Sequence, residues 1–308
     1  MSNMTTSRIG QVNGGGAADA LFLKVFAGEV LAAFNAENKL MDKHMVRTIA
    51  NGKSAQFPVI GKTTASYHTV GNEILGTAFK HNERVVTIDG ILEADVFVSD
   101  IDEAMNHFDI RAEYARQLGE ALALKNDQQQ LQMGILAARA SATITGGDGG
   151  TTLTNAAFGT SGAAILSGFY DAGTALDQKN VSSNDRYGFL RPAQYALLAQ
   201  EEKAINQFYR GSGNIATGVI PLLNNIMVVK TNNLPSTNVN SGLSKYQGDF
   251  STVQGLVMHK SAIGTVKLMD MKVQKDYLLQ NLGTLIVASQ ALGTDILRPE
   301  SSVEMKTS

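Results

Sequence analysis

The chain contains no cysteine among its 308 residues. Disulfide bonds, thiolate metal sites and covalent catalysis by a thiol are therefore excluded, and the absence suits a reducing cytosol. No run of about 18 apolar residues occurs, so we expect no helix that spans a membrane. The first residues lack the apolar core of a secretory signal, and we expect none there. These absences indicate a protein that stays in the compartment where it is made.

Basic residues are no more numerous than acidic ones. Lys and Arg total 26 against 28 Asp and Glu, which gives a formal net charge of −2. A protein that binds nucleic acid strongly usually carries a basic excess gathered on one face. Any contact with DNA is therefore expected to be weak. Apolar residues make up 44% of the chain, enough for a substantial core.

Patterns that carry catalysis or ligand binding are also missing. No two of the five histidines have the i, i+4 spacing of a helical metal site. Asp100, Asp102 and Glu103 stand at the expected start of a helix, where they suit its dipole without a metal ion. The glycine-rich stretch 146–150 has no phosphate-binding pattern, and no serine lies in a Gly-x-Ser-x-Gly pattern. We therefore predict no catalytic, cofactor-binding or metal-binding residues.

Helical periodicity is strongest just after residue 100. Apolar residues from Ile101 to Leu122 recur every three or four positions and form one stripe of a helix expected over 101–138. At about 1.5 Å per residue this helix would be more than about 50 Å long, enough for a spine. Residues 1–19 are rich in Gly, Ser, Thr and Asn and are expected to form a mobile arm, followed by a short helix over 21–34.

Two strand signals flank an unusually long polar stretch. A strand is expected over 55–60, and a second strand region begins at Arg84 and bends or bulges at Gly90. Residues 61–83 between them are too many for an ordinary hairpin turn of about 2–5 residues. Long loops are commonly functional or disordered. We interpret this one as a projecting two-stranded arm, with a loop of no fixed structure as the alternative.

The remaining elements alternate between helix and strand. After a flexible crossing at 145–150, the pattern predicts helices over 161–179 and 192–209. Strands are expected over 186–190, 226–230, 256–259 and 264–268, with a Pro/Asn/Ser-rich excursion over 231–248. Residues 277–288 are apolar enough for helix or strand, and the tail from Leu297 is polar. Helices and strands in this mixed order predict an α+β fold.

Several stretches of the sequence resemble one known family. They occur in collinear order over most of residues 20–125 and 255–300. They read Leu-Phe-Leu-Lys-Val-Phe at 21–26, Gly-Lys-Ser-Ala-Gln-Phe-Pro-Val at 52–59, Thr-Ile-Asp-Gly at 87–90, Asp-Glu-Ala-Met-Asn-His at 102–107, Met-His-Lys-Ser-Ala-Ile-Gly-Thr-Val-Lys-Leu at 258–268 and Leu-Arg-Pro-Glu at 297–300. On these stretches the chain resembles the major capsid proteins of T-seven-like podoviruses, a branch of the HK97-like fold.

The resemblance implies a division of the chain. Residues 1–52 would be an N-terminal arm, and 53–90 an extended β-hairpin loop that lies over a neighbouring subunit. Residues 91–144 and 255–308 would form a peripheral domain with the long spine helix. Residues 145–254, where the similarity is weak, would form an axial domain around hexamer and pentamer centres.

The resemblance also implies function and partners. The chain would assemble with itself as hexamers and pentamers into an icosahedral shell around double-stranded DNA, in the host cytoplasm, with a scaffolding protein and a portal at one vertex. We expect a non-covalent shell, and no cofactor, enzyme activity or membrane partner. The residues expected to contact an adjacent subunit through the loop are Phe57, Lys62, Tyr67, Phe79 and Lys80. Two alternatives remain, namely an encapsulin-type cellular shell and a hydrolase that uses Asp89 or His259.

Overall fold

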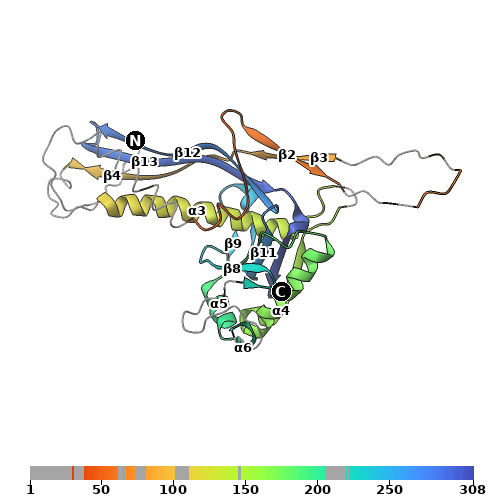
Figure 1. The fold of residues 1–308 in the computed structure, drawn as a ribbon. Coiled ribbons are helices and arrows are strands. Elements are labelled where there is room, and N and C mark those ends of the chain that lie inside the picture. Colours follow the sequence, from red (N-terminus) through yellow and green to blue (C-terminus); the bar gives the residue numbers. More distant parts are fainter. Residues whose placement is uncertain are drawn as a thin grey trace.

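The structure is a computed structural model that describes residues 30, 38–61, 65, 67–71, 73, 81–100, 111–144, 147–205, 220 and 222–308. Its described elements build three parts (Figure 1). A long four-stranded sheet lies over the helix α3, a six-stranded sheet with short helices lies below it, and a two-stranded hairpin projects to one side. The fold is mixed α+β, as the sequence predicts.

The four-stranded sheet has the order β1-β12-β13-β4. Its strands are Met45–Thr48, Ile263–Leu278, Gly283–Ile296 and Gly90–Ser99. β12, β13 and β4 are antiparallel neighbours, whereas β1 runs parallel to the start of β12. The helix α3, Arg111–Arg139, packs against this sheet through a core that includes Leu118, Leu122 and Ile286. The strongly alternating exposure of β12 from Met271 to Asp276 follows from the period of two in a strand.

The six-stranded sheet has the order β5-β14-β11-β6-β8-β7. Its strands are Thr151–Thr154, Ser302–Lys306, Val253–His259, Arg186–Leu190, Ile226–Lys230 and Leu222–Leu223. The helices α4, Gly162–Gln178, and α5, Pro192–Ala199, pack on it through Phe169 and Leu198. A four-residue helix α6, Glu202–Ile205, follows α5. The sheet thus combines strands from the middle of the chain with two strands from its last 56 residues.

The hairpin consists of β2, Ser54–Ile60, and β3, His81–Thr87, paired antiparallel over their whole length. Of the 61–83 stretch, only residues 81–83 lie in a described strand, and 62–64, 66, 72 and 74–80 lie outside the described residues, so the two-stranded arm there stays a prediction. The predicted bend at Gly90 is confirmed. Gly90 has φ +141 and separates β3 from β4, which belong to different sheets. Short elements complete the fold, namely the strands Asn238–Val239 (β9) and Gly248–Asp249 (β10) and the 3-10 turns Ala156–Gly159 (η1), Ser244–Tyr246 (η3) and Pro299–Ser301 (η4).

Three predictions about local structure require correction. The helix expected over 192–209 is interrupted after Ala199, because Gln200 ends α5 before Glu202 begins α6, and residues 206–209 lie outside the described part. The tail from Leu297 was described only as polar, with no strand expected. Residues 302–305 are instead fully buried in β14, which pairs with β11 and β5. The strand expected over 264–268 is too short, because β12 extends from Ile263 to Leu278; residues 277–288, left open between helix and strand, contain its end, a turn at 279–282 and the start of β13.

The spine helix is longer than the predicted stripe explains. Ala115, Leu118 and Leu122 are buried as predicted, whereas residues 101–110 lie outside the described part of the chain. From residue 126 to the end of the helix most side chains are buried, including several polar ones, because both sheets and the segment after residue 37 pack around the helix. Over the ranges that the structure describes, no helix is both long and apolar enough to cross a membrane.

Candidate inter-subunit surfaces

The far end of the β2–β3 hairpin carries fully exposed apolar side chains. Residues 67–71 lie well away from the body of the protein (Figure 1), where Tyr67 is 104% and Val70 95% exposed. Burying apolar surface is worth about 25 cal/mol per Å². A protein that presents such residues on a long projection therefore gains when another surface covers them.

Only two of the five predicted contact residues lie in the described part. Tyr67 is exposed at the far end, whereas Phe57 is partly buried near the base of the hairpin. There Phe57 packs against a small apolar cluster that contains Val86, Val266 and Leu297. Phe57 thus stabilises the base of the hairpin within its own chain. Lys62, Phe79 and Lys80 lie outside the described residues, and the contact of all five with a neighbour stays a prediction.

Polar contacts fix the base of the hairpin to the body. The Arg84 guanidinium donates from Nε to the carbonyl oxygen of Ile296 at 3.0 Å and lies 3.9 Å from the Asp295 carboxylate. Arg47 donates to the carbonyl oxygen of Gln56 at 2.8 Å, and Asn82 to that of Thr143 at 2.7 Å. The base is therefore held by its own chain, while the far end is free to contact another molecule.

A charged network surrounds Asp89, at the junction between β3 and β4. Its carboxylate forms an ion pair with Lys245 and accepts a hydrogen bond from the Tyr246 hydroxyl at 2.5 Å. Burial and the neighbouring Asp89 carboxylate raise the pKa of Tyr246 far above its usual range, so the hydroxyl keeps its proton. The network joins the hairpin junction to the 231–248 segment.

A second exposed apolar surface lies at the turn between β12 and β13, at the end of the long sheet opposite the hairpin (Figure 1). Its exposed side chains are Tyr277, Leu279 and Leu282, at 45%, 77% and 65%. Leu282 also adopts φ +47, a conformation that costs energy for a residue with a Cβ. Sequence analysis missed this surface. Three leucines around Gln280 and Asn281, just before a glycine, were the available signal for an apolar turn.

The segment from residue 38 to 48 is tied to the body by buried contacts. His44 is 1% exposed, and its ring nitrogens lie 2.8 Å from the Leu40 carbonyl oxygen and 2.7 Å from the Thr265 hydroxyl. Burial lowers the pKa of His44 to about 4, so the ring is neutral near pH 7. These contacts place β1 beside β12. The predicted mobile arm and the helix over 21–34 fall on residues that, apart from Val30, the structure does not describe.

A buried carboxylate lies inside the spine helix. Asp127 is 0% exposed and accepts hydrogen bonds on one oxygen from the Lys39 backbone N–H at 3.0 Å and from the Asn233 side chain at 3.4 Å. Its other oxygen has no hydrogen-bond partner. Burial raises the pKa of Asp127 to about 6. This group therefore holds three segments together at an electrostatic cost.

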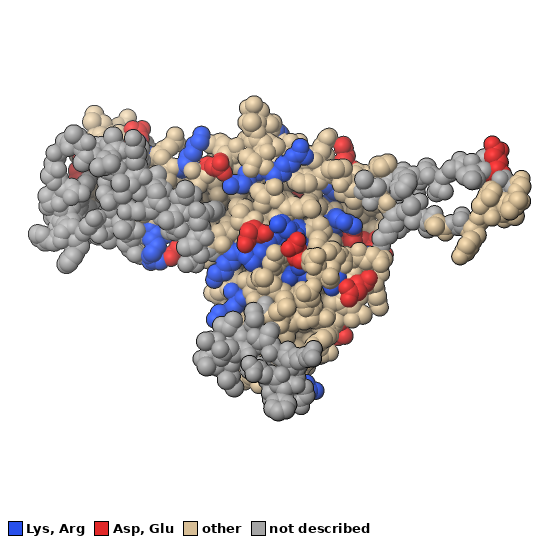
Figure 2. Space-filling view, in the orientation of Figure 1, with Lys and Arg blue, Asp and Glu red and all other residues tan. Residues whose placement is uncertain are grey.

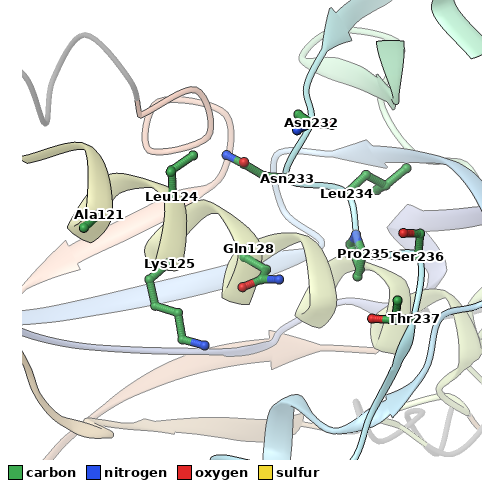
Figure 3. A pocket seen from close by; sticks show the side chains of 10 residues that line it. All are labelled: Ala121, Leu124, Lys125, Gln128, Asn232, Asn233, Leu234, Pro235, Ser236 and Thr237. Atoms are coloured by element: carbon green, nitrogen blue, oxygen red, sulfur yellow. The ribbon is translucent and has the colours of Figure 1, made fainter. Parts of the chain in front are cut away.

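An open hollow of about 490 Å³ lies next to Asp127, between α3 and residues 232–237 (Figure 3). Gln128 and Lys125 extend from the helix on one side, and Asn233 and Pro235 lie on the other. No acid lines it together with a histidine or serine. The hollow therefore offers no catalytic constellation.

The hydrolase alternative rested on Asp89 and His259, which have different partners. Asp89 is held by Lys245 and Tyr246, whereas His259 lies 2.8 Å from the Ser261 hydroxyl in the turn between β11 and β12. Ser261 is 4% exposed and too buried to attack a substrate. Among the described residues no group of three His, Asp or Glu could hold a metal ion.

Charges of both signs are mixed over the body in the view of Figure 2. The projecting arm in this view is mostly uncharged among its described residues. The mixture agrees with the near-neutral composition. In this view the described residues form no basic stripe of the kind that grips nucleic acid.

A long spine helix under a four-stranded sheet, a projecting hairpin and a separate six-stranded sheet define a shell-forming protein of the HK97-like capsid fold. The capsid structure of the cyanophage P-SCSP1u matches this chain with a TM-score of 0.79 and 38% identity, covering 100% of this chain and 99% of that one. The sequence profile of the Gp10A-like major capsid proteins matches residues 56–306, and the chain belongs to this family.

Curated relatives agree. The major capsid protein of Enterobacteria phage T3 is 35% identical over 95% of this chain and 93% of its own length. That of Escherichia phage T7 is 36% identical over 92% of this chain and 90% of its own. The protein is thus a major capsid protein of a phage virion, and its family is structural rather than enzymatic. The match favours a phage shell over the cellular nanocompartment.

Proposed function

We propose that the chain builds its shell from hexamers and pentamers, in which the β2–β3 hairpin lies over an adjacent subunit. The observation that carries this proposal is the full exposure of Tyr67 and Val70 at the end of a hairpin whose base is fixed. In the loop, Phe57, Lys62, Tyr67, Phe79 and Lys80 supply the contacts. Draping arms give a large contact area to a subunit whose isolated surface stays soluble.

The domain division supports this arrangement when each domain is defined by its sheet instead of by a range of residues. The peripheral domain then contains α3 and the β1-β12-β13-β4 sheet, and the axial domain contains the β5-β14-β11-β6-β8-β7 sheet. This scheme places β11 and β14 in the axial domain, whereas the division by residue number assigned 255–308 to the peripheral domain. The exposed turn of Leu279 and Leu282 lies at the outer end of the peripheral domain, where it meets a subunit of another hexamer or pentamer.

The partners follow from the assembly. A scaffolding protein directs closure in the host cytoplasm, a portal occupies one vertex, and the packaged double-stranded DNA touches the inner wall only weakly. The near-neutral charge supports the last point, since release of the genome requires contacts that do not hold it.

Deletion of residues 64–80 tests the hairpin contact. We expect the deleted chain to fold but to form no closed particles in electron micrographs, when expressed with its scaffolding protein. A milder variant, Tyr67→Ser with Val70→Ser, should slow assembly without disturbing the fold, because both side chains are almost fully exposed. The matched control is Tyr170→Ser with Leu243→Ser, which removes two exposed apolar side chains from the body. Normal shells from both loop variants would overturn the proposal.

A further inference from the structure

Asp89 lies where the chain leaves the hairpin and enters the four-stranded sheet. Lys245 and Tyr246, its two partners, belong to the turn η3 in the segment that connects the six-stranded sheet to β10 and β11. The partners are 156 and 157 positions away in the sequence, by subtraction of the residue numbers. The contact therefore joins two regions that are distant in the sequence.

A third segment completes the network. The Lys245 ammonium donates to the Thr294 carbonyl oxygen at 2.9 Å, and the Thr294 N–H donates to the Tyr246 hydroxyl at 3.3 Å. The ammonium also lies 4.9 Å from the centre of the Tyr246 ring. Asp89 is only 12% exposed at its side chain and Lys245 27%, so water screens the pair weakly. We call Asp89, Lys245, Tyr246 and Thr294 the Asp89 clasp.

Both covalent connections of the hairpin pass through a glycine of positive φ. Gly52 precedes β2 with φ +114, and Gly90 follows β3 with φ +141. No atom lies within 4 Å of a Cβ built on Gly90, so the backbone conformation rather than crowding requires glycine there. Glycine backbone turns more freely than that of any other residue. The angle of the hairpin is therefore not fixed by the chain itself and must come from contacts at its base.

We propose that the Asp89 clasp, acting with the contacts of Arg84, Arg47 and Asn82, sets the angle of the β2–β3 hairpin relative to the body and couples it to the position of the 231–248 segment. The clasp holds the residue next to the Gly90 hinge, so movement of η3 moves the base of the hairpin. Two regions are coupled when one shared element, here the clasp, changes the position of both. The role of this coupling in a shell rests on the proposed function, in which the two regions touch different neighbours. The coupling itself is a property of the single chain.

Paired spin labels measure the hairpin angle directly. The chain contains no cysteine, so Val70→Cys at the far end and Ala163→Cys on α4 give one labelled pair. Labelled protein is diluted with excess unlabelled protein, so that distances between copies do not contribute. In Lys245→Met and Asp89→Asn, we expect the distance distribution to broaden about twofold, because a released hinge samples more angles.

The matched control is Lys267→Met. Lys267 pairs with Asp270 at 2.8 Å within β12, so this variant removes an ion pair that joins no separate segments. It should leave the distribution unchanged. Hydrogen exchange provides a second readout, because the Ile88 and Asp89 amides donate to Lys53 and Leu292 and should exchange faster only in the clasp variants.

Unchanged distances in Lys245→Met and Asp89→Asn would overturn the proposal. If either variant unfolds, Tyr246→Phe decides, since it removes only the hydroxyl that bridges Asp89 and Thr294. Broadened distances in that variant support the clasp, and parental distances refute it. The measurement concerns one chain, so a failed clasp leaves the assembly proposal standing, and a chain that does not assemble can still show the clasp.

Discussion

Replacement of Asp127 by Asn should make the protein more stable at neutral pH. Asp127 is 0% exposed, and burial raises its pKa from 3.8 to about 6. The difference is 6 − 3.8, about 2 pKa units, and at about 1.4 kcal/mol per unit the charged carboxylate costs the folded state about 3 kcal/mol. Asn has nearly the same shape and carries no charge.

The sign of the pH dependence follows from proton binding. Between pH 4 and 6 the folded chain holds the Asp127 proton more tightly than the unfolded chain, so the free energy of unfolding falls as pH rises through this window. The Asn variant lacks this fall. The difference between the two proteins should therefore be small near pH 4 and reach about 2–3 kcal/mol above pH 6, after allowance for weaker hydrogen bonds to a neutral amide.

Urea denaturation at several pH values measures this difference. Midpoints and slopes are compared for the parent, Asp127→Asn and the control Asp270→Asn. Asp270 is exposed, and the hydrogen bond from Lys267 lowers its pKa, so its replacement should be slightly destabilising instead. The reasoning is refuted if Asp127→Asn is less stable than the parent at pH 7 and the gap does not change between pH 4 and 7.

Two further predictions concern the ion pair between Arg139, at the end of α3, and the buried Glu304, and the chemistry of the shell. Arg139 donates to both oxygens of the fully buried Glu304, at 2.8 and 2.5 Å, and this hydrogen bonding raises its pKa. Arg139→Met should therefore lower the free energy of unfolding by about 3–5 kcal/mol, measured by urea denaturation. The double variant Arg139→Met with Glu304→Leu should recover most of this loss. Full additivity of the two single changes would contradict this account. Purified shells boiled in denaturant should run as one band at the monomer mass, whereas a ladder of multimers would show covalent cross-links between subunits.

The sequence predicts best the strands that are short apolar runs with turn residues at their ends. The strands 186–190 and 226–230 have the predicted bounds, because each is a short apolar run ended by turn residues. β14 was missed because its sequence, Ser-Val-Glu-Met-Lys, contains polar residues that normally face water. Its Glu304 is buried only because Arg139 reaches it from 165 positions away. Local pattern carries no information about such a partner.

The same limit applies to the candidate surfaces. Length and polarity were enough to predict an excursion after residue 60, where Tyr67 is fully exposed, whereas its interpretation as a two-stranded arm stays a prediction. The side of the hairpin that packs on the body of the same chain was not predictable, because Phe57 packs against a cluster with Leu297, which is distant in the sequence. The partners of Asp127 and Asp89 were likewise not predictable, since residues 39, 233, 245 and 246 come from distant segments.

The distribution of exposed apolar residues limits the kind of assembly that this chain can form. The described segment 67–71, with Tyr67 and Val70, lies at one extremity, and the turn between β12 and β13, with Leu279 and Leu282, lies at the opposite one (Figure 1). A two-fold dimer formed around a patch at one end leaves the other end in water. A ring covers a second patch, but only in one plane. An assembly in which each chain touches several neighbours at different ends covers both, and a closed shell provides those contacts.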